Sequence, residues 1–301
     1  MRTNPGATGK SEGSRAQHLI FYAVIGRLGV HAAYVLLFFV VSWYTLKPST
    51  AARCRPYLER RFPGCGGMHM LRHIWKLQWN FGLCLVDRAA AGINGRFFFA
   101  EEALEAIRGL AHGGGRRDGG LILLSAHTGA RHMAQVFLAG HVGRPVHVLG
   151  VKDRGDVDRE AHEHSGAEAP YSVIDPADGP MSVVRILRIL RAKEILCMMG
   201  DRAFGSGATL AVNFLGEPVL LPYLAFRMSA ASGAPVAVVF HLRTGVCRGE
   251  TRVADVIQAP VDLKNDPEAY RPYVQRFASL LEAFTAEHPY QFFNFFNLWE
   301  K

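Results

Sequence analysis

The second half of the chain alternates short apolar runs with longer stretches of helical pattern. The apolar runs are 121–126, 145–151, 171–175, 194–199 and 234–242. Runs of this length are typical of strands, and the segments between them are long enough for helices. The pattern therefore predicts an α/β fold with helices on both faces of a central sheet. At 301 residues the chain can form one such domain with a short appendage.

Each predicted strand runs into a polar residue at its carboxyl end. These residues are His127, Lys152, Asp175, Asp201 with Arg202, and His241. Ligands of open α/β sheets bind outside the carboxyl ends of the strands, so these side chains are expected to converge. A strand end also becomes polar simply because the chain leaves the core there. For Lys152, Asp175 and His241, each taken alone, this simpler explanation is favoured.

His127 lies where a predicted strand turns into a helix. Thr128 and Gly129 follow it, and a new helix can begin there with little steric obstruction. A neutral imidazole in this place can take a proton from a hydroxyl near neutral pH. The pattern predicts a general base, although a histidine taken alone is more often structural.

Gly200, Asp201 and Arg202 follow another predicted buried strand. The glycines after them, Gly205, Gly207 and Gly216, indicate a loop that exposes its backbone. Arg202 can bind a phosphate group through two parallel hydrogen bonds, as on a pantetheine carrier or a lipid head group. A local ion pair between Asp201 and Arg202 explains the same residues equally well.

The N-terminal region contains a long apolar run. Residues 28–46 have no charged side chain and lie between Arg27 and Lys47. As a helix the run would be about 28 Å long, which permits either a membrane span or embedding at the membrane surface. A buried core helix is the less favoured interpretation, because aromatic residues lie near both ends beside basic residues. We therefore expect a disordered tail over 1–17, a membrane-associated helix over 18–47 and a catalytic domain over 48–301.

Charge and cysteine content restrict the partners. Residues 1–61 carry nine Lys and Arg against two acidic residues, whereas the rest of the chain is almost balanced. This distribution favours contact with an anionic membrane surface and argues against a nucleic-acid-binding face. The five cysteines form no CxxC pair, and HExxH is absent, so no metal site is predicted. The segment His162-Glu163-His164 is more typical of a solvated surface.

Several segments together resemble the lauroyl/myristoyl acyltransferases of bacterial lipid A biosynthesis, which are related to the glycerolipid acyltransferases. The resemblance extends from about residue 15 to 300. The segments that carry it are LKPSTAAR after the apolar run, VDR (86–88), LILLSAHTGARH (121–132), GDRAFG (200–205), NFLGEPV (213–219), SGAPVAVVF (232–240) and QFFNFFNLWE (291–300). The resemblance implies a mixed, mostly parallel central sheet flanked by helices.

The resemblance also implies that His127 is the catalytic base. Members of this family have an acidic residue five positions later, where it orients the imidazole, and this chain has His132 there. Either another acid, such as Asp201 or Asp175, takes its place in space, or activity is reduced. A capping or surface role for His132 is equally open. The basic residues expected to bind substrate are Arg131, Arg202 and Lys152 or Arg154.

The expected reaction moves a fatty acyl group from an acyl carrier protein or coenzyme A thioester to a hydroxyl or amine of a lipid or saccharolipid. No cofactor besides the thioester co-substrate is expected, and the expected location is the bacterial inner membrane with the catalytic domain facing the cytoplasm. A serine nucleophile is disfavoured because GxSxG is absent. The alternative is a catalytically impaired member that binds a lipid or partner at the membrane.

The C-terminal aromatic residues have helical spacing. Phe292, Phe295, Phe296 and Trp299 would form one stripe if residues 291–300 were a helix. Core packing is the favoured role for this stripe, ahead of an acyl-chain wall.

Overall fold

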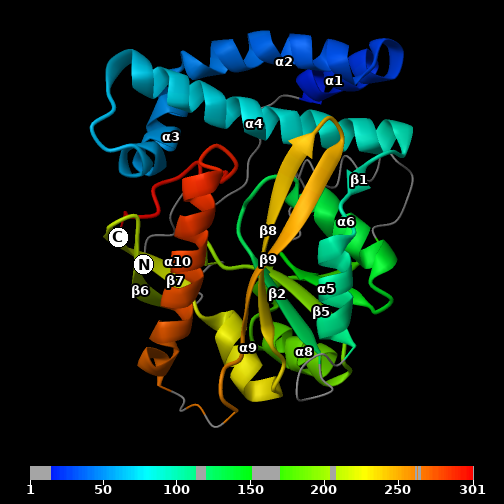
Figure 1. Cartoon of the computed structure of the whole chain (residues 1–301), viewed down its shortest axis with the longest axis vertical. Helices are drawn as coiled ribbons and strands as arrows, with labels where there is room; N and C mark the ends of the chain where they lie inside the picture. Colours follow the sequence, from blue (N-terminus) through cyan, green and yellow to red (C-terminus); the bar gives the residue numbers. More distant parts are fainter. Residues whose placement is uncertain are drawn as a thin grey trace.

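The computed structural model describes residues 15–112, 120–150, 170–203, 208–261, 263 and 266–300. Figure 1 shows a layer of long helices lying across one end of an α/β body. The layer consists of α1 (Arg15–Leu28), α2 (Val30–Thr45), α3 (Pro48–Arg61) and α4 (Gly67–Asn94). The body contains a seven-stranded sheet and a separate hairpin.

The central sheet has the strand order β1-β9-β8-β2-β5-β3-β4. Its strands are β1 (Phe98–Phe99), β2 (Leu121–Ser125), β3 (Val146–Leu149), β4 (Ser172–Ile174), β5 (Ile195–Met199), β8 (Val236–Gly245) and β9 (Arg248–Ile257). Neighbouring strands are parallel except β8 and β9, so the predicted mixed, mostly parallel sheet is confirmed. All five predicted strands are present. The β8 strand continues to Gly245, so the prediction that His241 follows the end of a strand is wrong.

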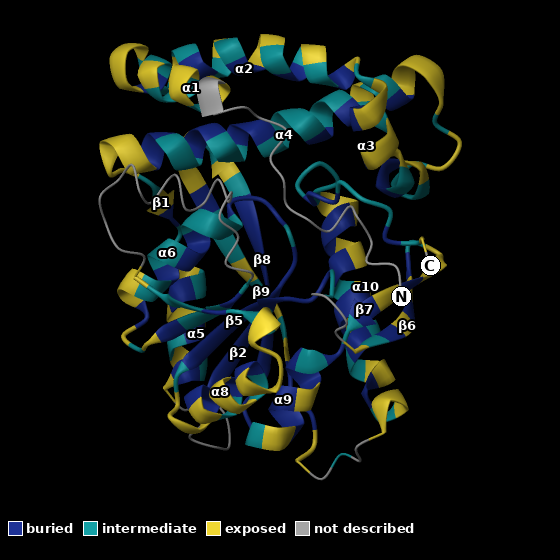
Figure 2. Ribbon diagram, turned by 180° about the vertical axis from the view of Figure 1, so that it is seen from behind, coloured by how far each residue is buried: buried dark blue, intermediate teal, exposed yellow. Residues whose placement is uncertain are grey.

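Helices cover both faces of this sheet, as the apolar runs predict. On one face lie α5 (Glu102–Ala111) and α6 (Arg131–His141), and on the other lie α8 (Pro180–Arg191), α9 (Leu224–Ser232) and α10 (Arg271–Glu287). Figure 2 shows the strands buried between them. Alternate residues of β2 belong to different cores, since Leu123 packs toward α5 and α6 whereas Leu124 packs in the core that includes α8, α9 and α10. Two 3₁₀ helices, Pro176–Asp178 and Pro267–Tyr270, precede α8 and α10.

The motif NFLGEPV forms the turn and adjoining half of an antiparallel hairpin outside the central sheet. Its strands are β6 (Thr209–Phe214) and β7 (Glu217–Pro222). The two-residue turn contains Leu215 and Gly216, both with positive φ, which is the backbone conformation of favoured hairpin turns. The hairpin packs against α10, where the Gln275 side chain hydrogen bonds to the backbone of Asn213.

The N-terminal apolar region differs from the single helix expected over 18–47. Gly29 has a φ of 83°, which breaks the helix between α1 and α2, and α1 begins at Arg15, inside the expected tail. The rest of that tail lies outside the described residues. Helices α1, α2 and α4 share a core, in which Leu37 and Val41 of α2 are buried. In the described part of the chain no single helix is long and apolar enough to cross a membrane, although α2 and α3 pass together as a pair bent by 87°.

Candidate active site

Strand pairing brings His127 and Asp201, both expected from the sequence to be site residues, next to each other. Strands β2 and β5 are parallel neighbours in which Ser125 lies opposite Met199. The residues two positions beyond this pair, His127 and Asp201, therefore leave the sheet side by side. The His127 Nδ1 lies 2.9 Å from Oδ1 and 2.8 Å from Oδ2 of Asp201. Both distances are within hydrogen-bond range, so Asp201 orients the imidazole ring.

Burial and neighbouring charges determine the protonation of this pair. The His127 side chain is 17% exposed and that of Asp201 is 1% exposed. Burial lowers the pKa of His127 to about 4, and the nearby Arg202 contributes in the same direction. Burial alone would raise the pKa of Asp201, but His127 and Arg202 outweigh it and lower that pKa. At neutral pH the imidazole is neutral and Asp201 is ionised, so the ring donates its Nδ1–H and keeps Nε2 as a proton acceptor.

Arg202 lies on the other side of the same carboxylate. Its guanidinium nitrogen is 3.7 Å from Asp201 Oδ2, and its Cζ is 4.5 Å from the ring centroid of Phe296. The predicted local Asp–Arg ion pair is therefore present. Burial lowers the pKa of Arg202, and its Nε has no hydrogen-bond partner among the described residues. A guanidinium with an unused buried donor suits an anionic ligand or a developing oxyanion.

The remaining residues expected from the sequence to form the site do not all lie beside His127 and Asp201. Arg131 and His132 lie in the first turn of α6, where the charge of Arg131 adds to the effects that lower the His127 pKa. Asp175 caps a 3₁₀ helix by accepting a hydrogen bond from Ala177 N at 2.9 Å, which is the structural role favoured for it. Lys152 and Arg154 lie outside the described residues, as do Gly205, Gly207 and the segment His162-Glu163-His164.

His241 lies within β8 and faces away from solvent. Its Nδ1 is 3.0 Å from Thr251 Oγ1, and burial lowers its pKa to about 3, with a smaller effect from the charge of Arg131. It is therefore a neutral, buried histidine at neutral pH. The structural role favoured for it from the sequence agrees with this placement.

The C-terminal aromatic segment is not helical, which contradicts the conditional helix over 291–300. Its chain instead runs antiparallel to the loop after β2: Gly129 N donates to Gln291 O at 2.9 Å, and Phe293 N donates to His127 O at 2.7 Å. Phe292 is fully buried against Tyr57 and Phe214, so the favoured packing role is confirmed. Sequence reasoning missed this contact with the active-site loop, because a strand-like pairing of a few residues has no periodicity of its own.

The sequence model of the bacterial lipid A biosynthesis acyltransferase family matches residues 103–301. This range is about two thirds of the chain and contains His127, Asp201, Arg202 and the C-terminal segment. The chain belongs to this family. The lipid A acyltransferase match begins after α4, so the helical layer that carries the N-terminal part of the resemblance lies outside it. No curated protein matches the chain.

Asp201 matters for the one position at which this chain departs from the expected family pattern. The resemblance places an acid five residues after the catalytic histidine, where this chain has His132. Asp201 provides a buried carboxylate within 2.9 Å of the His127 Nδ1 from a different strand. The departure in sequence therefore does not leave His127 without an acidic partner.

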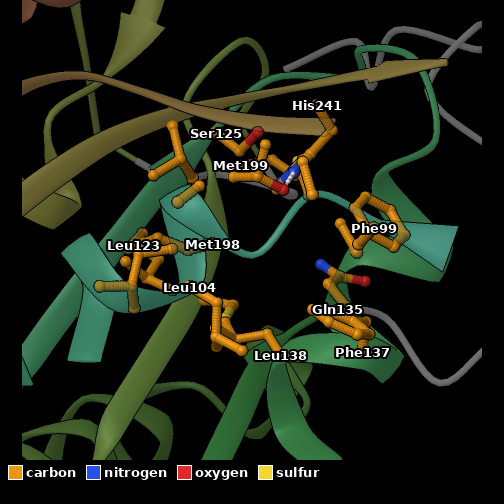
Figure 3. A pocket seen from close by; sticks show the side chains of 17 residues that line it. Phe99, Leu104, Leu123, Ser125, Gln135, Phe137, Leu138, Met198, Met199 and His241 are labelled. Atoms are coloured by element: carbon orange, nitrogen blue, oxygen red, sulfur yellow. Dashed lines mark hydrogen bonds between the residues drawn. The ribbon is translucent and has the colours of Figure 1, made fainter. Parts of the chain in front are cut away.

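An apolar pocket lies beside the site, on the α5 and α6 face of the sheet. Its cavity volume is about 30 Å³, which is room for about two water molecules. In Figure 3, Ser125, Met199 and His241 lie on one side of the pocket, and Leu104 and Leu138 lie on the other. Ser125 and Met199 are the strand-end residues two positions before His127 and Asp201, which do not themselves line the pocket. Gln135 and Thr251 are among its few polar wall residues.

Metal-binding side chains do not gather in the described part of this lipid A acyltransferase family member. No group of three or more His, Cys, Asp or Glu residues is arranged to bind a metal ion within the described ranges. The five cysteines are all free thiols.

Proposed function

We propose that this protein transfers a fatty acyl group from a thioester of acyl carrier protein or coenzyme A to a hydroxyl or amine of a lipid A-type acceptor or another lipid. His127 is the general base. The observation that supports this proposal best is the buried carboxylate of Asp201 within 2.9 Å of the His127 Nδ1. This is the arrangement of an oriented imidazole with one free ring nitrogen, as general-base catalysis requires.

The reaction proceeds by direct transfer. The acceptor O–H or N–H gives its proton to His127 Nε2 while the oxygen or nitrogen attacks the thioester carbonyl carbon. The tetrahedral intermediate collapses, the C–S bond breaks, and the imidazolium returns the proton to the leaving thiolate. Asp201 stabilises the imidazolium between these two steps. No covalent acyl-enzyme forms, so one histidine serves first as base and then as acid.

Arg202 is the group that we assign to the oxyanion of the tetrahedral intermediate. The backbone N–H groups of Thr128 and Gly129, which directly follow the base, already donate to Ala126 O and Gln291 O. The guanidinium lies next to Asp201 and has a buried Nε without a partner among the described residues. A preformed cation in a partly buried site stabilises developing negative charge strongly.

The apolar pocket is the site that we propose for the acyl chain. Its wall consists mainly of aliphatic and aromatic side chains, which favour a hydrocarbon chain through burial of apolar surface. Because the present cavity volume is about 30 Å³, the wall side chains must move apart to admit the chain, and we expect the thioester carbonyl at the end lined by Ser125 and Met199. The few polar side chains in the wall give the carbonyl end a place to lie.

The helical layer is the part that we propose to contact the membrane. Phe39 and Trp43 on α2 are each 65% exposed, and the basic residues of the N-terminal region lie in the same part of the chain. Apolar side chains beside basic residues suit an anionic lipid surface. The location that we propose is the bacterial inner membrane, with the catalytic domain facing the cytoplasm.

The test is transfer by wild type and His127→Ala. Lauroyl thioesters of acyl carrier protein and of coenzyme A serve as donors and a lipid A precursor as acceptor, with EDTA present because no metal is required. We expect a loss of at least about 10³-fold in kcat for His127→Ala, since the base is removed. His112→Ala, at the exposed end of α5, is the matched control and should keep wild-type activity. Equal rates in all three proteins would favour the catalytically impaired, lipid- or partner-binding alternative.

A further inference from the structure

The loop that carries His127 is hydrogen bonded to other segments on both of its sides. On one side, His241 N on β8 donates to the Thr128 hydroxyl at 3.1 Å. On the other, Gly129 N donates to Gln291 O, and Phe293 N donates to His127 O. The loop is therefore fixed between β8 and the C-terminal segment. Its position depends on how these two neighbours are joined to each other.

The Gln291 side chain makes that junction. Arg243 N donates to its Oε1 at 2.8 Å, and its Nε2 donates to Arg243 O at 3.1 Å. The pairing of β8 with β2 runs only from Val236 to Val238, so β2 does not reach Arg243. The Gln291 amide serves as a strand partner for this backbone, because it can accept and donate at once.

The fit around Gly129 shows how closely these parts meet. Gly129 has a φ of 37°, and a Cβ built on it would lie 2.3 Å from His241 O and 2.9 Å from Gln291 Oε1. No side chain fits into this space without displacing β8 or Gln291. The loop is thus packed directly against both of its neighbours, and movement of Gln291 is passed on to it.

Arg243, the residue that Gln291 binds, is itself fixed to the helical layer. Its Nε donates to Asp87 Oδ2 on α4 at 2.6 Å, and a second guanidinium nitrogen is 3.0 Å from the Tyr34 hydroxyl on α2. Tyr34 also hydrogen bonds to Asp87, which is buried. A continuous set of contacts therefore joins α2 and α4 to the loop of His127 through Arg243 and Gln291.

We propose that Gln291 is a positioning residue for the catalytic base: its amide joins β8 to the C-terminal segment and thereby fixes the His127 loop relative to the helical layer. This inference rests on the proposed function of His127. Gln291 touches no reacting atom. A misplacement of about 1 Å in a catalytic group can lower the rate about 10²-fold, so the junction matters although it is remote from the chemistry.

The chain offers a closely matched control. Gln275 makes the same pair of side-chain bonds to the backbone of Asn213, at 2.8 Å and 2.9 Å, on the hairpin strand β6. Gln291 and Gln275 are both partly buried. Replacing either by Met removes two hydrogen bonds of one type and keeps the length of the side chain. Only Gln291 contacts the residues around the His127 loop.

The experiment compares Q291M, Q275M and H127A with wild type, using the lauroyl thioester and lipid A precursor as probes. We expect a fall in kcat of about 10²-fold for Q291M with little change in KM, and near wild-type kcat for Q275M. The acidic limb of the Q291M pH–rate profile should move to higher pH. A displaced His127 contacts more water, so burial lowers its pKa less. Asp201, Arg202 and Arg131, the charged groups that act on His127, are unchanged in this variant.

Thermal unfolding of each variant separates positioning from loss of fold. One outcome would overturn the positioning role and leave the proposed function standing. In that outcome Q291M is folded and has wild-type kcat and an unchanged acidic limb, whereas H127A is inactive. Full activity of H127A would instead overturn the proposed function. If Q291M does not fold, Q291E replaces it, since Glu still accepts from Arg243 N but cannot donate to Arg243 O. Wild-type kcat in folded Q291E would then overturn the role.

Discussion

Seventy-four positions of chain separate His127 from Asp201, yet their side chains share two short contacts. Each residue alone has an ordinary explanation, as a buried histidine or as part of an Asp–Arg turn. Together they form an oriented imidazole whose ring is neutral at physiological pH. Since the pKa of His127 is lowered to about 4, the base is available over the whole neutral range.

Asp201→Asn is expected to lower kcat about 10³- to 10⁴-fold, because an amide that donates to Nδ1 stabilises the tautomer whose Nε2 carries the proton. In wild type, kcat should be level near neutral pH and fall as pH approaches about 4, where His127 becomes protonated. Steady-state kinetics across pH measure both effects. The comparison variant is Asp175→Asn, since Asp175 is the other acid expected as a partner of His127 and caps a 3₁₀ helix. Unimpaired transfer by Asp201→Asn would exclude Asp201 as the partner of the base.

His132→Glu restores the acid that the family pattern places five residues after the base. Because Asp201 already bonds to Nδ1, a second acid adds little, and we expect kcat to stay within about threefold of wild type. The same transfer assay measures this. A tenfold gain would mean that Asp201 is a poor substitute for the missing acid, and a large loss would give His132 a role of its own.

Elements of three kinds meet at the site. Parallel strands β2 and β5 deliver the catalytic pair, the antiparallel extension of β8 forms one wall, and the irregular C-terminal segment forms the other. The helices α5 and α6 close the pocket on one face of the sheet. The specificity for the acyl chain is therefore expected to depend on residues of these two helices.

Leu138→Phe should shift the donor preference toward shorter chains. Leu138 lines the side of the pocket away from His241, and a larger ring there shortens the space for the end of the chain. A change of one methylene in such a pocket alters kcat/KM by roughly 10-fold or more. Competition between thioesters of different length measures the shift. Leu187→Phe, on α8 behind the opposite face, should leave the preference unchanged.

At the scale of the whole molecule, the helical layer lies over the carboxyl edge of the sheet. Phe81 on α4 packs against Phe293, the residue whose N–H binds His127 O, and Figure 1 shows α4 between α2 and the body. The exposed apolar face of α2 is therefore on the same end of the molecule as the site.

The double variant Phe39→Glu/Trp43→Glu should weaken binding to vesicles that contain anionic lipid by at least about 10²-fold, since two apolar side chains contribute roughly 1.5–3 kcal/mol each when buried. Vesicle flotation measures the bound fraction. The control is Met181→Glu/Val184→Glu on α8, at the far end of the body, where the exposed fractions are similar. Equal flotation of both variants would contradict membrane contact through α2.

The amino-acid sequence by itself determined the class of fold and the residues that leave the ends of the strands. Uninterrupted apolar runs such as 121–124 and 195–199 identify buried parallel strands, because both faces of such a strand exclude polar side chains. The strand β9 was not predicted, because the expected strands were identified from continuous apolar runs and β9 mixes charged residues with apolar ones. The break at Gly29 was also missed, because composition does not reveal a single positive φ.

Only the tertiary structure decided which of these residues work together. The adjacency of β2 and β5 selects Asp201 rather than Asp175 as the partner of His127, and strand order is not encoded in the local sequence. The roles that we propose for Gln291 and Arg243 also depend on contacts between distant segments. Their contacts join segments 48 residues apart, and such contacts depend on the packing of the whole chain rather than on any local pattern.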